Sequence, residues 1–298
     1  MPPSSDQPER AATATARATL ERTAERLARA GIADAMVDAE LLLGHVLQVS
    51  RGAVQAAVVR GDALAAEAVA ALDELTERRA AREPLQHIIG VAPFRHLELK
   101  VGPGVFVPRP ETEIVAQIAI DALSAVASAS PVAVDLGTGS GAIALALATE
   151  VPHARVYAAE NSVEAFIWTR ENFELVGADN ARLAFVDLAK AFPELDGTVS
   201  VIVSNPPYVP ENAIPRDPEV RLFDPQAALY GGPDGLDVVR EVSRAALRLA
   251  HPGATVVIEH GEWQGADIRA LLTADGWRAA ATHPDLTLRD RATTAVRP

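Results

Sequence analysis

The feature of this sequence that most constrains its fold is a series of short apolar runs that alternate with helical segments after Pro110. The runs are PVAVDLG, ARVYAAE, ARLAFVD, VSVIVSNPPY and ATVVIEHG. Strand-like runs separated by helical periodicity predict βαβ units and a mostly parallel sheet. Two later segments, WRAAATHPD and TTAVR, predict closing strands at an antiparallel edge. We therefore expect an α/β fold with a doubly wound, Rossmann-like sheet of seven strands.

The residues before this alternation divide into three parts. Residues 1–14 are mostly Pro, Ser, Ala and Thr, a composition that predicts a flexible tail. Residues 15–82 carry apolar side chains at helical spacing, which predicts a small helical bundle with breaks at Gly31, Gly52 and Gly61. Residues 83–108 hold short alternating runs divided by Gly and Pro and predict a linking β-hairpin. Residues 109–298 then form the domain that contains the sheet.

Composition limits the class of protein and its partners. The chain has 27 Lys and Arg against 40 Asp and Glu, a net charge of −13, which disfavours binding to phosphate backbones. It has no cysteine, so disulfides, thiolate nucleophiles and cysteine-ligated metals are excluded. The N-terminus does not resemble a signal peptide, and no stretch reaches the roughly 18 apolar residues of a membrane helix. We expect a cytoplasmic monomer with no direct nucleic acid and no membrane partner.

The histidines and tryptophans carry little functional signal. The seven histidines show no metal-ligand spacing such as HExxH, so we expect no metal. Trp168 and Trp263 lie in segments that read as helical and are predicted to be packing residues.

A glycine-rich loop follows the first apolar run of the sheet domain. Gly137-Thr138-Gly139-Ser140-Gly141 lies between the strand that ends at Leu136 and the helix AIALALATE. Glycines let such a loop turn sharply and approach a ligand closely. Glu160 ends the next run, where a carboxylate can accept both ribose hydroxyls of a nucleoside. The same spacing fits a dinucleotide fingerprint, so a nicotinamide dehydrogenase remains an alternative at this point.

Asp187 ends the third apolar run, and ligands bind beyond the carboxyl ends of strands in an open α/β sheet. Asp187 could accept a hydrogen bond from the exocyclic amine of an adenine while Leu188 covers the ring. On local grounds it is equally well explained as a helix N-cap before AKAF.

The tetrapeptide Asn205-Pro206-Pro207-Tyr208 follows a strongly apolar strand. Two prolines stiffen the backbone and remove N–H donors, so the Asn205 side-chain oxygen and the carbonyls of Asn205 and Pro206 form a fixed cluster of acceptors. Such a cluster suits an NH₂ group whose lone pair is delocalised, because orientation makes the weak nucleophile face an electrophilic methyl. Tyr208 can stack on the flat substrate.

Together DLGTGSG, an acid at the end of the second strand and NPPY resemble the class I S-adenosylmethionine-dependent methyltransferases that modify exocyclic or amide nitrogens. The resemblance narrows with PRPETE at residues 108–113, preceded by GVFV, and with RDR at residues 289–291. These features are similar to the release-factor glutamine N5-methyltransferases, known as PrmC or HemK, over nearly the whole chain.

The resemblance implies a cofactor, a substrate and their residues. S-adenosylmethionine would be contacted by Gly137, Thr138, Gly139, Ser140, Gly141, Glu160, Asp187, Leu188 and Asn205. A glutamine amide of a peptide-chain release factor would be held by Asn205, Pro206, Pro207 and Tyr208, with Phe106 packed on its side chain. Asn205, Pro206 and Tyr208 are the expected catalytic residues. The family more often has Asp at the position of Glu160, and Asn161 replaces a more usual small or acidic residue.

Rival functions remain open at this stage. The same tetrapeptide could serve an adenine-N6 methyltransferase, although the acidic chain has no basic groove signature. A glutamine methyltransferase of a ribosomal protein is a second relative, but PRPETE favours the release-factor branch. From other classes, a dehydrogenase would bind NAD instead of S-adenosylmethionine, and a binding module would show no turnover. The helical residues 15–82 carry none of the chemistry-bearing motifs, so we expect them to dock the protein substrate.

Overall fold

The computed structural model describes residues 14–298. These residues divide into two compact units, and the boundary in the sequence lies between Ile89 and Gly90. The tail expected over residues 1–14 lies, except for residue 14, outside the described residues. Among the helices of residues 14–298, none combines the length and hydrophobicity that crossing a membrane requires.

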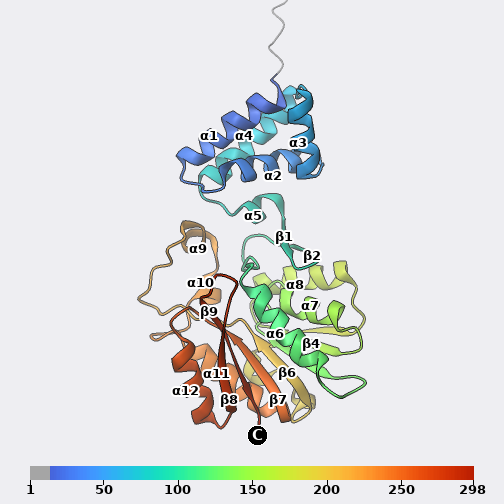
Figure 1. Ribbon diagram of the computed structural model, residues 1–298, viewed down its shortest axis with the longest axis vertical. Helices are drawn as coiled ribbons and strands as arrows, with labels where there is room; N and C mark the ends of the chain where they lie inside the picture. Colours follow the sequence, from blue (N-terminus) through green and yellow to red (C-terminus); the bar gives the residue numbers. More distant parts are fainter. Residues whose placement is uncertain (1–13) are drawn as a thin grey trace, which may run out of the picture. The chain divides into compact units, whose positions relative to one another are not determined.

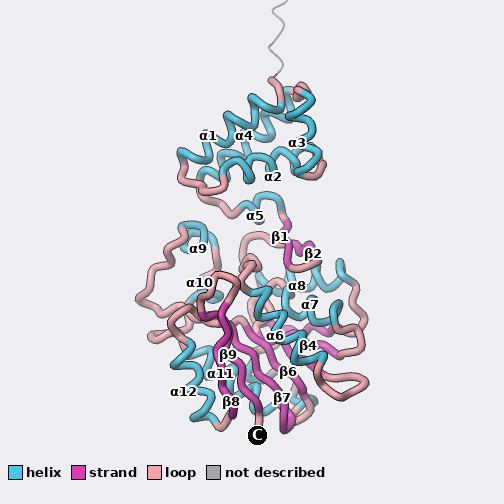
Figure 2. The backbone as a smooth tube through the Cα atoms, viewed as in Figure 1, coloured by secondary structure: helices cyan, strands magenta, loops and turns pink. Residues whose placement is uncertain are grey.

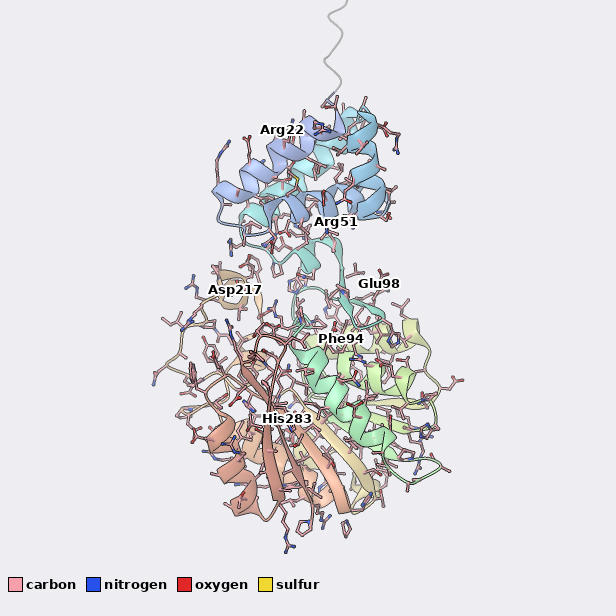
Figure 3. All side chains as sticks on the ribbon, viewed as in Figure 1. Arg22, Arg51, Phe94, Glu98, Asp217 and His283 are labelled. Atoms are coloured by element: carbon pink, nitrogen blue, oxygen red, sulfur yellow. The ribbon has the colours of Figure 1, made fainter. Side chains whose placement is uncertain are left out.

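The first unit is helical, as expected. Its helices are α1 (Ala16–Arg29), α2 (Ala35–Leu47), α3 (Arg51–Arg60), α4 (Ala66–Ala80) and α5 (Leu85–Ile89). Leucines from three of these helices are fully buried and form the centre of the unit: Leu27, Leu42, Leu43 and Leu72. Arg79 and Asp38 join α4 to α2 through a nearly buried ion pair at 2.7 Å. Arg51, labelled in Figure 3, pairs with Glu40 of α2 at 2.5 Å.

Two expectations for this region are wrong in detail. Gly52 does not break a helix, because it is the second residue of α3. The break lies before it, where Gln48 ends α2 in a left-handed conformation and the Ser50 hydroxyl accepts a hydrogen bond from Ala53 N. The hairpin expected over residues 83–108 begins later, because Leu85 and Ile88 form one turn of helix α5 and are buried in the first unit.

The hairpin itself consists of β1 (Val91–Phe94) and β2 (Leu97–Lys100), paired antiparallel. Side chains alternate across it: Phe94 is buried and Glu98 is exposed, and both are labelled in Figure 3. This period of two is the pattern that the sequence predicted over this segment.

The second unit is built on a sheet that has seven strands within residues 14–298 and is drawn in magenta in Figure 2. Its strands are β3 (Val132–Leu136), β4 (Arg155–Glu160), β5 (Ala181–Phe185), β6 (Val199–Ser204), β7 (Ala250–Glu259), β8 (Arg278–Pro284) and β9 (Asp290–Val296). The spatial order is β5-β4-β3-β6-β7-β9-β8. The first five pair in parallel, while β9 pairs antiparallel with β7 and with the edge strand β8. The doubly wound sheet and its antiparallel edge are confirmed.

Helices cover both faces of this sheet, as Figure 1 shows. Helices α6 (Thr112–Ser124), α7 (Ala142–Glu150) and α8 (Val163–Val176) pack on one face, against Val201, Val203 and Val257. Helices α11 (Asp237–Leu249) and α12 (Gly265–Asp275) pack on the other, together with the short helices η1 (Leu188–Lys190) and η2 (Pro193–Leu195). Burial on both faces explains why β3 and β6 are apolar along nearly their whole length.

The segment between β6 and α11 contains two short helices, α9 (Pro218–Phe223) and α10 (Gln226–Leu229). Asp217, labelled in Figure 3, caps α9 by accepting a hydrogen bond from Glu219 N. Of the two tryptophans predicted to be packing residues, Trp168 packs against Gly102 and donates a hydrogen bond to Pro103 O, so its packing role is confirmed. Trp263 is 84% exposed in a turn before α12, and its predicted role is wrong.

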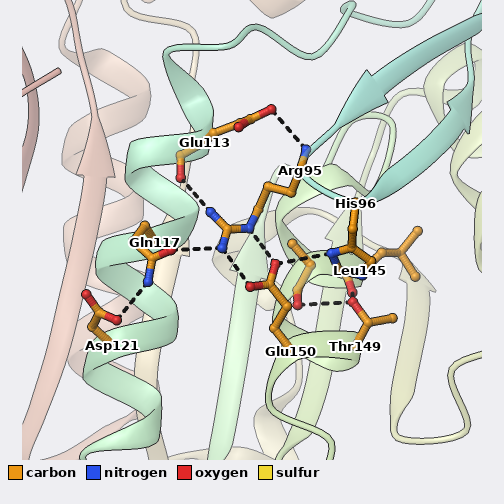
Figure 4. A network of polar contacts seen from close by, with 9 residues as sticks. Arg95, His96, Glu113, Gln117, Asp121, Leu145, Thr149 and Glu150 are labelled. Carbon is orange, nitrogen blue, oxygen red and sulfur yellow. Dashed lines mark hydrogen bonds and ion pairs between the residues drawn. The ribbon is translucent and has the colours of Figure 1, made fainter. Parts of the chain in front are cut away.

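A polar network ties the hairpin to two helices of the second unit (Figure 4). Arg95, at the hairpin turn, donates hydrogen bonds to both carboxylate oxygens of Glu150 on α7 and to Gln117 on α6. Its backbone N–H donates to Glu113 at 2.9 Å. The hydrogen bonds from Arg95 hold the pKa of Glu150 below its ordinary value. One arginine therefore joins three elements that are distant in sequence.

We expect Arg95→Ala to lower the free energy of unfolding by about 1.5–3 kcal/mol, since it removes charge-assisted hydrogen bonds from partly buried groups. The stability that comes from the lowered pKa of Glu150 exists above its unfolded pKa and is lost as pH falls through the folded one. The difference between parent and variant should therefore shrink on acidification. Urea unfolding at pH 7 and at pH 3.5 measures both. Arg170→Ala, an exposed arginine of α8, is the control; an equal loss there would contradict the role of the network.

Candidate functional site

Polar side chains stand at the carboxyl ends of the central strands, on the face covered by α6 to α8. Asp135 lies on β3, Glu160 ends β4, Asn205 follows β6 and Glu259 ends β7. Residues two positions earlier belong to the hydrophobic core of that face: Ala133, Ala158, Val203 and Val257. Because side chains alternate along a strand, the apolar face continues directly into a row of hydrogen-bonding groups.

Side chains of α8 donate hydrogen bonds to backbone carbonyls of the glycine loop after β3. The side chain of Thr169 donates to Gly139 O, and that of Asn172 donates to Ser140 O at 2.9 Å. Gly137, Gly139 and Gly141 have φ values of 73°, 58° and 86°, which side-chain-bearing residues rarely adopt. The loop conformation thus depends on its glycines and on α8.

Glu160 lies beside this loop, and its carboxylate accepts hydrogen bonds from backbone N–H groups of the loop and of the residues after β4. Its Oε2 accepts a hydrogen bond from Gly139 N at 2.8 Å, and its Oε1 accepts from Asn161 N at 2.9 Å and from Ser162 N at 2.8 Å. A carboxylate offers about four acceptor positions, so three backbone N–H groups leave roughly one for a ligand. Glu160 therefore shapes the loop as well as presenting a carboxylate to the space above it.

Asp135 is buried beneath the same loop. Its Oδ2 accepts from the Thr138 hydroxyl at 2.6 Å and from Ala144 N at 3.2 Å, and its Oδ1 makes no hydrogen bond within residues 14–298. Burial raises the pKa of Asp135 to about 7, against the lowering effect of these hydrogen bonds.

Asp187 and Leu188 follow β5. Asp187 Oδ1 caps η1 by accepting from Ala189 N at 2.9 Å, so the capping interpretation is correct for this oxygen. Asp187 and Leu188 also line the cavity above the glycine loop, as the predicted ligand contact requires.

The tetrapeptide Asn205-Pro206-Pro207-Tyr208 leaves β6 beside the glycine loop. Ser204 Oγ donates to Leu136 O at 2.6 Å, which joins the ends of β6 and β3. Asn205 Nδ2 donates to the Thr112 hydroxyl at 3.4 Å, and Tyr208 O accepts from Gln264 Nε2 at 2.9 Å. Burial raises the pKa of the Tyr208 phenol above its ordinary value, so this hydroxyl remains protonated.

Arg109 of the PRPETE segment contacts both Asp224 and the ring of Phe106. Arg109 pairs with the buried Asp224 at 2.7 Å, and its guanidinium lies 5.0 Å from the centre of the Phe106 ring. Burial raises the pKa of Asp224 to about 6, while Arg109 opposes the shift. Phe106 is thereby fixed by a cation–π contact whose cation is itself held by a carboxylate.

A cavity of about 750 Å³ opens over these groups. It is lined by most of the predicted site residues: Phe106, Gly137, Thr138, Gly139, Ser140, Glu160, Asp187, Leu188, Asn205, Pro206, Pro207 and Tyr208. Gly141 does not line it and instead packs against α8. No group of His, Cys, Asp or Glu positioned to hold a metal ion occurs in the described part of the chain.

Several lining residues were not identified from the sequence. Thr112, Asp135, Glu259 and Arg291 all face this cavity. Asp135 and Glu259 stand at strand ends that the sequence did predict, so their position was the available signal. Thr112, at the start of α6, and Arg291, on β9, reach the same cavity only through the packing of these elements, which no local pattern specifies.

Comparisons with known proteins match this architecture. Residues 18–90 match the PrmC N-terminal domain, and residues 96–228 match the methyltransferase small domain. A release factor glutamine methyltransferase of Streptomyces coelicolor is 49% identical over 93% of this chain and 96% of its own length. A 4-amino-L-phenylalanine/4-methylamino-L-phenylalanine methyltransferase of Streptomyces pristinaespiralis is 39% identical over 96% of this chain and 97% of its own length. A crystal structure of a methyltransferase from Pyrococcus furiosus, 20% identical, covers 68% of this chain and 90% of its own with a TM-score of 0.50.

The sheet order, the glycine loop and the tetrapeptide at adjacent strand ends define a class I methyltransferase fold. Within that class, the chain belongs to the release factor glutamine methyltransferase family. The resemblance inferred from DLGTGSG, NPPY and PRPETE is confirmed at the level of the family.

We expect Gly141→Ala to destabilise the protein more than Gly137→Ala does. Both changes place an alanine in a left-handed backbone conformation, which costs about 1–2 kcal/mol. A Cβ at Gly141 would also lie 3.1 Å from Phe173 and 3.3 Å from Leu145 and Thr169, and such overpacking costs about 1–3 kcal/mol, whereas a Cβ at Gly137 meets nothing within 4 Å. Thermal unfolding of both variants without ligand measures the difference. Equal melting temperatures would contradict the close packing of the loop on α8.

Proposed function

We propose that this protein transfers a methyl group from S-adenosylmethionine to the side-chain N5 of a glutamine in peptide-chain release factors. The observation that carries the proposal is the position of Asn205-Pro206-Pro207-Tyr208, which shares one cavity with the glycine loop in a chain of this family. The reaction belongs in the cytoplasm, where translation ends. Incubation with S-adenosylmethionine and a release factor, followed by mass spectrometry, tests it: one methyl should appear on a glutamine.

The residues around the glycine loop fit S-adenosylmethionine. A Cβ at Gly137 or Gly139 would meet no atom within 4 Å, so the backbone there borders open space that a ligand can approach. Glu160 would accept a hydrogen bond from the ribose, Asp187 from the adenine amine, and Leu188 would cover the ring. When bound, this cofactor supplies an electrophilic methyl group.

The tetrapeptide would hold the nitrogen that receives the methyl. An amide nitrogen is a weak nucleophile because its lone pair is delocalised into the carbonyl. The Asn205 side-chain oxygen and the Pro206 carbonyl would accept its two N–H groups and fix its lone pair toward the glycine loop, which is catalysis by orientation and preorganised dipoles. Pro207 stiffens this turn, while Tyr208 and Phe106 would pack on the flat amide and its aliphatic stem.

The first unit, residues up to Ile89, would dock the protein substrate. Residues 18–90 match the PrmC N-terminal domain, and none of the described residues 14–89 lines the cavity. A domain without chemistry of its own is therefore available for recognition of a folded partner.

A small arylamine is a second candidate substrate. Its support is the 39% identical relative whose name assigns it to 4-amino-L-phenylalanine, an NH₂ group conjugated to a ring. The same acceptor cluster serves both nitrogens. Parallel assays with a release factor and with 4-amino-L-phenylalanine distinguish them, and methylation of the free amino acid alone would overturn the release-factor assignment.

We expect Glu160→Ala to weaken S-adenosylmethionine binding about ten- to hundredfold, because losing charge-assisted hydrogen bonds costs about 1.5–3 kcal/mol. Part of the loss reflects the N–H of Gly139, which Glu160 holds in the loop. Isothermal calorimetry measures the affinity. Glu174→Ala, an exposed carboxylate of α8, is the control. Unchanged affinity in Glu160→Ala would remove Glu160 from the cofactor site.

We expect Asn205→Ala to remain folded, to keep most of its cofactor affinity and to lose on the order of 10²–10³ in kcat, since one preorganised contact at the reacting nitrogen is removed. The loss should appear in kcat at saturating substrate, because the contact strengthens in the transition state. Steady-state methylation of a release factor at saturating substrate measures it, with the exposed Asn212→Ala as control. Parental turnover in Asn205→Ala would mean that the tetrapeptide is only a rigid turn.

A further inference from the structure

A buried carboxylate without an evident role faces the reacting end of the cavity. Glu259 ends β7, is 2% exposed and lines the cavity together with Asn205 and Tyr208. Ser204, the last residue of β6, pairs with Ile258 of β7 in the parallel register. The next residues on the two strands, Asn205 and Glu259, are therefore neighbours. Their side chains point to the same face, toward the start of α6.

Glu259 carries an acceptor atom that its surroundings do not satisfy. Its Oε2 is buried and makes no hydrogen bond within residues 14–298. A buried carboxylate is costly unless it is paired, so such a group in a cavity points to a function. Burial raises the pKa of this carboxyl, and the Thr112 hydroxyl and the Asn205 side chain, as hydrogen-bond donors, lower it.

These neighbours determine which way the Asn205 amide faces. Its oxygen and nitrogen are similar in size, so only the hydrogen-bond network sets their positions. An ionised carboxylate accepts and never donates. Nδ2 of Asn205 donates to Thr112 Oγ1 at 3.4 Å, and a carboxylate at the neighbouring register position favours the same orientation, with Nδ2 toward Thr112 and Glu259 and Oδ1 toward the cavity.

We propose that Glu259 is a positioning residue that, with Thr112, holds Nδ2 of Asn205 and so keeps Oδ1 aimed at the substrate NH₂. The inference rests on the proposed function, because it assigns Asn205 Oδ1 to that nitrogen. A protonated or amide side chain at residue 259 could donate a hydrogen bond, and the Asn205 amide could then turn its nitrogen toward the substrate.

The titration of Glu259 supplies a readout. Burial raises the pKa of Glu259 to about 7, opposed by the Thr112 hydroxyl and the Arg291 charge, while Glu111 raises it further. The other ionisable groups nearby are Tyr208, which burial keeps protonated, and Asp285, which pairs with Arg291 at 3.3 Å. The rate of methyl transfer should rise with pH through about 7 as Glu259 ionises.

Stability should change in the opposite direction. The folded pKa of Glu259 lies above the unfolded value, so the unfolded chain loses this proton first and the folded state becomes less stable as pH rises toward 7. Glu259→Gln removes that penalty. Its melting temperature without ligand should therefore exceed that of the parent at pH 8, and the difference should narrow toward pH 5.

The test combines Glu259→Gln with Asn205→Ala. In the parent background Glu259→Gln should lower kcat roughly ten- to hundredfold, as expected for a misaligned reacting group, with little change in KM or in S-adenosylmethionine affinity. In the Asn205→Ala background it should cost nothing further, because the residue through which it acts is gone. Glu174→Gln, exposed on α8, is the matched control.

Either of two results would overturn the proposal. One is a loss in kcat that adds fully to that of Asn205→Ala. The other is an inflection near pH 7 that persists in Glu259→Gln, since it would then belong to Asp135, whose pKa burial also raises to about 7. A parent protein that methylates no glutamine would instead refute the proposed function, which separates the two failures.

Discussion

The parallel pairing of β3 with β6 is the contact on which the rest of the second unit depends. The chain passes from β3 outward through β4 and β5 and then returns to pair β6 against the other side of β3. The loops that leave β3 and β6 therefore diverge to opposite sides and leave a crevice between them, where ligands bind in open α/β sheets. The hydrogen bond from Ser204 Oγ to Leu136 O joins the two strand ends. Without this pairing, the glycine loop and the tetrapeptide would not share a cavity.

The crevice is rich in acceptors. Asp135 and Glu259 are buried carboxyls whose pKa burial raises to about 7, and Glu160 is held by backbone N–H groups. Rigid carbonyls of the tetrapeptide add further acceptors. Such an environment suits a ligand that presents N–H donors and positive charge, as the proposed amide substrate and the proposed methyl donor would. Oriented acceptors rather than a strong base thus characterise this site.

The PRPETE segment links the site to its supports. Arg109 reaches Asp224 after the tetrapeptide, Thr112 contacts Asn205, and Glu113 accepts a hydrogen bond from the hairpin residue Arg95. The same short segment also begins α6, which packs on the apolar face of the sheet. The PRPETE hexapeptide therefore connects three parts of the second unit: the hairpin, the tetrapeptide and the segment that contains Asp224.

The sequence by itself determined the element types, the order of the strands along the chain and the family. Apolar runs between helical segments specify buried strands, and glycines or prolines at their ends specify loops, because these preferences are local. Two predictions from the sequence were wrong. Gly52 was expected to break a helix but lies inside α3, which Ser50 caps, and Trp263 was expected to pack in a helix but is exposed in a turn. Only the tertiary structure decided that Glu160 binds the backbone of its own loop, that Gly141 packs on α8, and that Glu259 lies beside Asn205. These contacts join residues that are distant along the chain, so strand register and helix packing, rather than local preference, bring them together.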